Sequence, residues 1–363
     1  MNYFIQEFQT DAGVQKTAGI KARDDVDAIL ADMGMNRISL SSFEEERTNG
    51  GLLKKLCGHL TVLNIWKKQL KSLCPGDKLF VQFPVLGHSV FLSGLFQSCE
   101  KRGVQIILLI HDLELLRWAK RKDISVLKKI RLRIEEKSIL SCCSRIIVHN
   151  LKMKEMLCQT GISGDKVISL DIFDYLVPEY NPRKINAAQR DKGGPVIIAG
   201  ALAPHKARYI YRLSGELRVN LYGVKYSGEV NERIRYFGAF PPDELPYAME
   251  GSFGLVWDGE SIETCSGVYG EYLRINNPHK TSLYLASGLP VIIWSQAALA
   301  GFVTENRCGI AVDSILDIEQ RLASMTEEEY TQLKEQAAKV GERLRSGYYT
   351  RRAAAVCLGW SKM

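Results

Sequence analysis

The chain has 363 residues, of which 46% are apolar and 25% charged, and a formal net charge of +7. Its length exceeds one typical hydrophobic core and indicates a globular protein of two domains. No bilayer-spanning apolar run or signal peptide is evident, so we expect a cytoplasmic protein. The nine scattered cysteines lack C-x-x-C spacing and support neither a disulfide framework nor a zinc site.

The first half of the chain alternates between strand and helix patterns. The run 104–110 (VQIILLI) is apolar at every position except Gln105, which is typical of a buried parallel strand. We predict strands at 3–8, 37–40, 78–83, 104–110, 145–148 and 166–170, and helices from about residue 26 and at 52–70, 88–102, 124–140 and 151–158.

Prolines and glycines interrupt this pattern at 177–195, after which it resumes. We therefore predict an N-terminal domain at 1–177, a linker at 178–195, a C-terminal domain at 196–345, and a final helix at 346–363 that returns to the first domain. In the second half we predict strands at 196–199, 219–222, 234–237, 254–257 and 291–294, and helices at 204–217, 243–249, 278–286 and 326–344. The expected fold is α/β, with two Rossmann-like doubly wound domains that face a ligand cleft.

The stretch 276–282 (NNPHKTS) carries the strongest functional signal. Asn277 is a candidate N-cap and Pro278 fits the first helical position, so the first turn offers backbone N–H groups and the positive end of a helix dipole. Lys280 adds a charge, and Thr281 adds a hydroxyl donor. The combination predicts a phosphate or diphosphate site. The alternative is a well-capped helix whose polar first turn faces water.

Several cofactor and nucleophile motifs are missing from the sequence. We find no G-x-G-x-x-G after the first strand, no P-loop, no G-x-S-x-G elbow and no H-E-x-x-H. A D-x-D pair, Asp25 and Asp27, resembles a divalent-ion site. We place it instead in the first turn of an amphipathic helix, where acids complement the dipole. We therefore predict no metal and no cofactor.

Four segments together resemble the GT-B glycosyltransferases: the glycine-containing loop 12–19, His111-Asp112 after the buried strand, the turn 238–246 (GAFPPDELP), and 276–282. More closely, the chain resembles the bacterial group of the streptococcal adhesin glucosyltransferase (Gtf-three) and the β-1,6-galactofuranosyltransferases. That likeness lies in 18–26 (AGIKARDDV), 111–117 (HDLELLR) and 277–280 (NPHK).

The resemblance implies a metal-independent transferase. It would move a hexose of the glucose, galactose or galactofuranose class from a UDP-sugar to a glycan acceptor on a lipid carrier or protein, in surface polysaccharide or glycoprotein biosynthesis. The acceptor would bind the N-terminal domain. Two alternatives stay open, a nucleotide-sugar epimerase of GT-B fold and a catalytically silent nucleotide-sugar-binding subunit.

We assign candidate residues to each part of the donor. The diphosphate-binding set is Lys280, His279 (through its backbone), Thr281, Asn277, Lys206, Arg208, and Thr17 and Gly13 in the glycine loop. The nucleoside-binding set is Phe240, Gly238 and Glu271, with Asp258, Glu260 and Glu263 as competitors of Glu271. The alternative readings are a solvated helix start for Lys206 and Arg208, a plain surface loop for Thr17, and a core aromatic for Phe240.

An inverting transfer needs a base for the acceptor hydroxyl. Asp112 and His111 are the leading catalytic candidates because they follow a strand at its carboxyl end. His88 and His149 are secondary candidates for the same base. For each of the four residues the alternative is a structural hydrogen bond.

The segment 117–137 holds nine Lys or Arg against three Asp or Glu. It fits a solvated helix face or a contact with an anionic membrane surface at the inner face of the cell membrane. No nucleic-acid motif accompanies the charge, so we expect no nucleic-acid partner. Homo-oligomerisation is left open.

Overall fold

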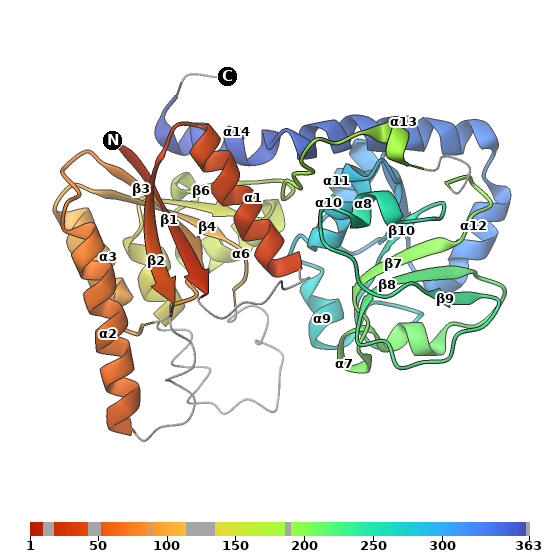
Figure 1. Ribbon diagram of the computed structural model, residues 1–363, viewed down its shortest axis with the longest axis horizontal. Coiled ribbons are helices and arrows are strands. Elements are labelled where there is room, and N and C mark those ends of the chain that lie inside the picture. Colours follow the sequence, from red (N-terminus) through yellow and green to blue (C-terminus); the bar gives the residue numbers. More distant parts are fainter. Residues whose placement is uncertain (10–17, 43–51, 88, 114–134, 186–189, 361–363) are drawn as a thin grey trace. The chain divides into compact units, whose positions relative to one another are not determined.

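The computed structural model of the protein describes residues 1–9, 18–42, 52–87, 89–113, 135–185 and 190–360 (Figure 1). Contacts divide the chain into two compact units. Met1–Gln15, Val26–Leu170 and Arg351–Met363 form the first unit, and Lys16–Asp25 and Asp171–Thr350 form the second. The predicted domain boundaries at 177 and 345 remain predictions from the sequence.

The first unit contains a parallel sheet of six strands in the order β2-β1-β3-β4-β5-β6. The strands are β1 (Asn2–Gln9), β2 (Asn36–Ser42), β3 (Lys78–Phe83), β4 (Gln105–Ile110), β5 (Arg145–Val148) and β6 (Val167–Ser169). The helices are α1 (Ala18–Asp32), which belongs to this unit from Val26 onward, α2 (Leu52–Leu70), α3 (Leu92–Lys101) and α6 (Leu151–Gln159), and Gly164–Lys166 forms a 3-10 turn.

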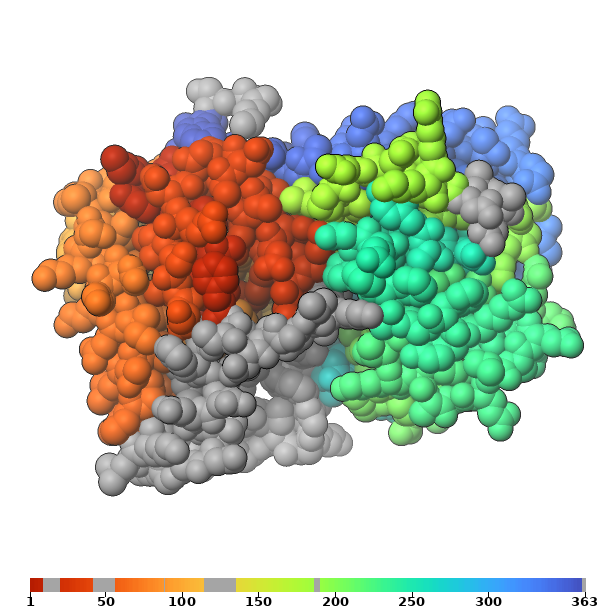
Figure 2. All heavy atoms as spheres, viewed as in Figure 1, coloured from red at the N-terminus to blue at the C-terminus, as the bar shows by residue number. Residues whose placement is uncertain are grey.

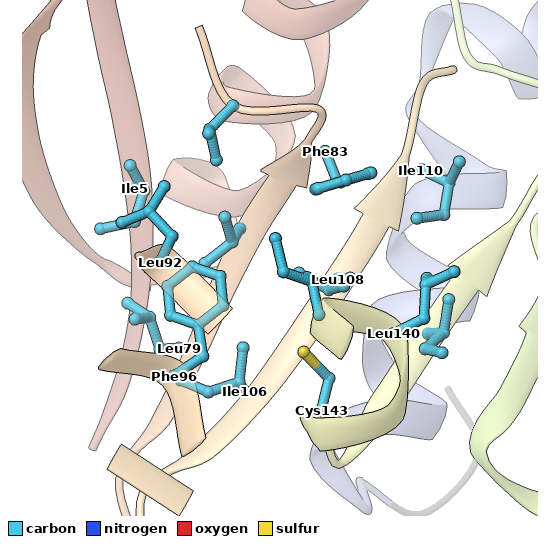
Figure 3. Packing of buried hydrophobic residues seen from close by; sticks show 14 of the residues in the cluster. Ile5, Leu79, Phe83, Leu92, Phe96, Ile106, Leu108, Ile110, Leu140 and Cys143 are labelled. Carbon is cyan, nitrogen blue, oxygen red and sulfur yellow. The ribbon is translucent and has the colours of Figure 1, made fainter. Parts of the chain in front are cut away.

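The core of the first unit lies between this sheet and its helices. Figure 3 shows Phe96 and Leu92 of α3 packed near Leu79 of β3 and Ile106 of β4. Helices α2 and α3 lie side by side (Figure 1), and the rings of Trp66 and Phe96 meet edge to face at 5.6 Å between centroids. Strand β4 is buried over its last five residues because a parallel strand is covered on both faces, as its apolar run predicts.

The last helix, α14 (Tyr348–Leu358), brings residues 351–363 into the first unit. Lys78 Nζ donates to the carbonyl of Leu358 at 2.7 Å, and Arg351 forms an ion pair with Asp32 at 2.6 Å. The predicted return of the C-terminal helix to the N-terminal domain is therefore confirmed.

The second unit repeats the architecture, with a parallel sheet in the order β12-β11-β10-β7-β8-β9. Its strands are β7 (Val196–Ala201), β8 (Val219–Val224), β9 (Ile234–Tyr236), β10 (Gly254–Val256), β11 (Val291–Trp294) and β12 (Gly309–Val312). The α-helices are α7 (Pro204–Ala207), α8 (Leu245–Ala248), α9 (Gly267–Tyr272), α10 (His279–Ala286), α11 (Ala300–Glu305), α12 (Ile318–Ser324) and α13 (Glu327–Arg345); Pro182–Lys184, Arg208–Arg212 and Ile315–Asp317 are 3-10 turns. The two-domain α/β prediction is confirmed.

Tight packing fixes α10 against this sheet. A Cβ added at Gly254 would lie 2.1 Å from the ring of Tyr284, so only glycine allows this approach. The Tyr284 hydroxyl accepts a hydrogen bond of 2.7 Å from the backbone N–H of Ala199. Helix α10 is thereby anchored to both β10 and β7, which places its first turn at the carboxyl end of the sheet.

Three local predictions are wrong, and a tertiary contact explains the first of them. The helix predicted at 204–217 ends at Ala207, because the backbone there pairs with Gly259 rather than continuing the helical ladder. Helix α1 begins at Ala18, so the D-x-D pair lies in its interior rather than in its first turn. The helix predicted at 88–102 begins only at Leu92.

Candidate functional site

The carboxyl ends of β7 and β10 meet at one loop of the second unit. The backbone N–H of Gly259 donates to the carbonyl of Lys206 at 2.8 Å, and the N–H of Tyr209 donates to the carbonyl of Gly259 at 3.3 Å. Lys206, which follows β7, therefore lies beside the segment 257–259, which follows β10. This is the edge at which doubly wound folds bind ligands.

Lys280 of α10 contacts the same segment. Its Nζ lies 2.9 Å from Asp258 Oδ1 and 3.0 Å from the carbonyl oxygen of Trp257. Both side chains of the ion pair are largely buried, at 13% and 10% exposed. Lys206 and Lys280 thus flank one loop, although they are 74 positions apart in the sequence (280 − 206).

Helix α9 adds an aromatic side chain to this edge and also carries Glu271. Lys206 Nζ lies 5.8 Å from the ring centroid of Tyr269, within reach of a cation–π contact. Glu271, on the same short helix, pairs with Arg274 at 3.3 Å. Tyr269 therefore joins the site without any signal in the sequence that sets it apart from other tyrosines.

The rest of the predicted phosphate stretch turns toward residues 171–174. Asn277 Nδ2 donates to the carbonyl of Asp171 at 3.0 Å, and Ser282 Oγ donates to the carbonyl of Phe173 at 2.6 Å. Because the Asn277 side chain is used there, Pro278 occupies the N-cap and the helix begins at His279. The prediction of Asn277 as N-cap is therefore wrong.

His279 and Thr281 are enclosed by protein. The His279 ring lies against Tyr175, 5.0 Å between centroids, and its Nε2 lies 3.2 Å from the carbonyl oxygen of Asp174. Part of the residue is exposed, but burial of the ring lowers the pKa of His279 to about 4, so the imidazole is neutral at physiological pH. The Thr281 hydroxyl is buried and has no hydrogen-bond partner within the described part of the chain. The polar first turn therefore does not simply face water.

The predicted nucleoside-binding turn lies at the surface of the second unit, in the segment from β8 to α8 that Figure 2 draws in green to teal. Gly238 has a φ of +76°, and an added Cβ there would meet nothing within 4 Å. Phe240 is half-buried, with its ring 6.0 Å from that of Tyr222, which in turn stacks on Phe237 at 4.9 Å.

The first acid of the D-x-D pair belongs to an ion-pair cluster of the second unit. Lys21 Nζ lies 2.8 Å from both Asp25 Oδ1 and Asp243 Oδ1, and Asp25 Oδ2 accepts from the backbone N–H of Leu176 at 3.0 Å. Burial raises the pKa of Asp25 to about 6, which the neighbouring ammonium of Lys21 opposes. No cluster of three or more His, Cys, Asp or Glu suited to a metal ion occurs in the residues described.

The two catalytic candidates lie in the first unit, directly after β4. The His111 backbone N–H donates to the carbonyl of Phe83 at 2.7 Å, and Asp112 follows it; both residues are half-buried. His149, at the end of β5, is fully buried, and burial lowers its pKa to about 4 against the opposing charge of Asp112.

The structure gives little or no information on the positions of the remaining candidates. Arg208 is exposed at the start of a 3-10 turn. Gly13, Thr17, His88 and most of the basic segment 117–137 lie outside the described residues. Among the described helices, none is long and apolar enough to cross a membrane.

Comparison with known proteins assigns the chain to a family. The model of the glucosyltransferase 3-like N-terminal domain matches residues 2–172, and that of the C-terminal domain matches residues 196–357. The chain belongs to the glucosyltransferase 3-like family. The family assignment confirms the resemblance to the bacterial glucosyltransferase and galactofuranosyltransferase group that the sequence motifs indicated.

Individual relatives agree with this assignment. The chain is 34% identical to the β-1,6-galactofuranosyltransferase WbbI of Escherichia coli K12 over 96% of each chain, and 23% identical to glucosyltransferase 3 of Streptococcus gordonii over 93% of each. The solved structure of WaaG, a glycosyltransferase involved in lipopolysaccharide biosynthesis, has the same fold, with a TM-score of 0.58, 10% identity, and coverage of 98% of this chain and 99% of that one. This member of the glucosyltransferase 3-like family is a glycosyltransferase of GT-B fold, and the epimerase and silent-subunit alternatives are not favoured.

Proposed function

We propose that the protein transfers a hexose of the glucose, galactose or galactofuranose class from a UDP-sugar to a glycan acceptor, without a metal ion. The observation that carries the proposal is the position of Lys280 at the start of α10, beside Asp258 and near Lys206. As the donor bond breaks, negative charge builds on the β-phosphate. Two lysines and a helix N-terminus supply the positive potential that other transferases obtain from a bound divalent ion.

The ion pair of Lys280 is compatible with this role. An ammonium group has three N–H donors, and the contacts with Asp258 and Trp257 account for two of them. The third donor is the one that we assign to a donor phosphate. Asp258 would then hold Lys280 in place before the substrate arrives, which lowers the entropy cost of binding.

The remaining candidates receive the other proposed roles. Lys206 is assigned to the diphosphate, and further candidates for that role are Arg208, Thr17 and Gly13. The turn at Gly238 and Phe240 is assigned to the nucleoside. Glu271 is assigned to the ribose. Asn277, His279 and Thr281 would act mainly by positioning the first turn, because their side chains are enclosed by residues 171–175 or by α10 itself. Asp112 and His111 are assigned to the acceptor hydroxyl.

A screen of nucleotide sugars for slow donor hydrolysis tests this function. We expect release of UDP from at least one of UDP-glucose, UDP-galactose or UDP-galactofuranose, faster than from GDP- or ADP-linked sugars. Activity should persist in excess chelator, because no step is assigned to a metal. Failure to hydrolyse or transfer from any UDP-sugar would contradict the function, and full loss in chelator with rescue by manganese would contradict the metal-independent mechanism.

We also propose a peripheral membrane contact through the basic segment 117–137, which would suit an acceptor on a lipid carrier at the inner face of the cell membrane. Replacing four or five of its Lys and Arg residues with Gln should reduce co-sedimentation with anionic vesicles, since each basic residue near such a surface contributes about 1 kcal/mol. Neutral vesicles serve as the control. If the wild type never sediments with anionic vesicles, the membrane contact is wrong.

A further inference from the structure

A buried chain of hydrogen bonds joins α1, β3 and the end of β4 in the first unit. Gln82 Nε2 donates to Asp27 Oδ1 at 2.7 Å, and Gln82 Oε1 lies 2.5 Å from His111 Nε2. Asp27 and Gln82 are each only 6% exposed. The chain therefore leads from the helix interior to one of the two catalytic candidates.

The chemistry of these groups fixes the direction of the chain. The NH₂ end of the Gln82 amide faces Asp27, because Gln82 Nε2 donates and the carboxyl oxygen Oδ1 accepts. The carbonyl end of that amide then faces His111, and a carbonyl oxygen also only accepts. His111 Nε2 must therefore carry the hydrogen, and in the neutral imidazole the lone pair is on Nδ1.

We propose that Asp27 and Gln82 are positioning residues that hold His111 as its Nε2–H tautomer, so that Nδ1 accepts the proton of the acceptor hydroxyl during transfer. This inference rests on the proposed function. In a single displacement, the acceptor oxygen bonds to the anomeric carbon and the bond to the β-phosphate oxygen breaks, with its electron pair leaving on UDP. The hydroxyl proton passes to Nδ1, and the imidazolium formed donates from Nε2 to Gln82.

The position of Gln82 supports this reading. It stands in β3, whose last five residues are all buried and otherwise apolar. An amide buried in such a strand is costly unless both of its ends are hydrogen-bonded, and Asp27 and His111 bond both ends. Strand β3 also accepts the backbone N–H of His111 through Phe83, so the same strand fixes the backbone and the ring of this residue.

Two substitutions separate this role from simple packing. Gln82→Met keeps the length of the side chain but removes both hydrogen bonds. Asp27→Asn keeps the shape but allows the residue to donate, so the Gln82 amide can reverse and present its NH₂ to His111 Nε2, which favours the Nδ1–H tautomer. The control is Asn220→Leu, because Asn220 is a buried strand amide in the sheet of the second unit.

The first measurement is the ¹⁵N spectrum of histidine-labelled full-length protein, with His111 assigned by its disappearance in His111→Gln. We expect the Nε2–H pattern for His111 in the wild type and in Asn220→Leu, and a shift toward the Nδ1–H pattern in Asp27→Asn. A wild-type Nδ1–H pattern, or an unchanged pattern in both Asp27→Asn and Gln82→Met, would overturn the proposal.

The second measurement is sugar transfer or donor hydrolysis by the same folded variants. We expect kcat to fall roughly tenfold or more in Gln82→Met and Asp27→Asn with little change in KM, since a misplaced base loses most of its contribution. An altered tautomer with unchanged kcat would overturn the catalytic part. Absence of wild-type turnover with every UDP-sugar would count against the proposed function instead, because the tautomer is measured without substrate.

Discussion

Lys280→Met is expected to weaken UDP binding by about 2–4 kcal/mol, the usual cost of removing one member of a largely buried charge pair at a binding site. This corresponds to a loss of affinity of roughly 30- to 1000-fold. The methionine keeps the apolar stem of the side chain, so the loss reports on the ammonium group. Isothermal titration calorimetry with UDP measures it directly, and unchanged affinity would contradict the phosphate-site assignment.

The ion pair with Asp258 requires a second variant. Lys280→Met leaves a carboxylate that is only 10% exposed without its cation, which lowers stability independently of any ligand. Lys280→Met combined with Asp258→Asn removes that charge, so we expect the thermal midpoint to recover while UDP affinity stays low. If the double variant also regains affinity, Lys280 acts only by neutralising Asp258. Lys192→Ala is a matched control, since Lys192 pairs with Glu327 in the same unit.

Asp174→Ala is expected to lower the free energy of unfolding by about 2–5 kcal/mol. The Asp174 carboxylate accepts from the backbone N–H groups of Tyr349 at 3.2 Å and Thr350 at 2.6 Å, in the first turn of α14. The geometry of a first helical turn offers its amides no intrahelical carbonyl, and each buried N–H left unsatisfied costs about 1–3 kcal/mol. Thermal and denaturant unfolding test the loss, with Asp165→Ala, at an exposed carboxyl, as a control expected to change stability by less than about 0.5 kcal/mol.

The same carboxyl should make stability depend on pH. Burial raises the pKa of Asp174 to about 7 in the folded protein, from an ordinary value of 3.8. Between these values the folded state binds the proton and the unfolded state does not, so the pH-dependent part of the Asp174 contribution to stability is full below about pH 4 and is lost as pH rises toward 7. The raised pKa of Asp25, about 6, acts in the same direction.

A comparison of variants separates the pH effect of Asp174 from the pH effect of two buried histidines. His149 and His279, with pKa values lowered to about 4, act in the opposite direction, since their unfolded forms bind protons between pH 4 and 6.5. Asp174→Asn removes one titrating group and leaves these unchanged. The gap in thermal midpoint between wild type and Asp174→Asn should therefore narrow from pH 5 to pH 8, and a constant or widening gap would show that Asp174 does not titrate as described.

Local patterns along the chain were sufficient to predict most strands of both sheets and the two-domain fold. Strands 78–83 and 145–148 and helix 52–70 occur at their predicted bounds, because apolar periodicity reports which side of an element is buried. The segment 295–325 received no prediction. Its elements α11, β12 and α12 have six, four and seven residues, and the two helices are too short for a helical period to emerge.

Some features of the candidate site were likewise predictable from local sequence, and others were not. The sequence by itself determined that 276–282 starts a helix near the end of a strand, that Lys280 is its charged residue, and that His111 follows a buried strand. Only the tertiary structure decided that Lys280 pairs with Asp258, that Asn277 binds residue 171, and that Asp27 and Gln82 reach His111. Helical and strand periods are local, whereas these partners lie 22 to 106 positions apart and are brought together by strand order and helix packing.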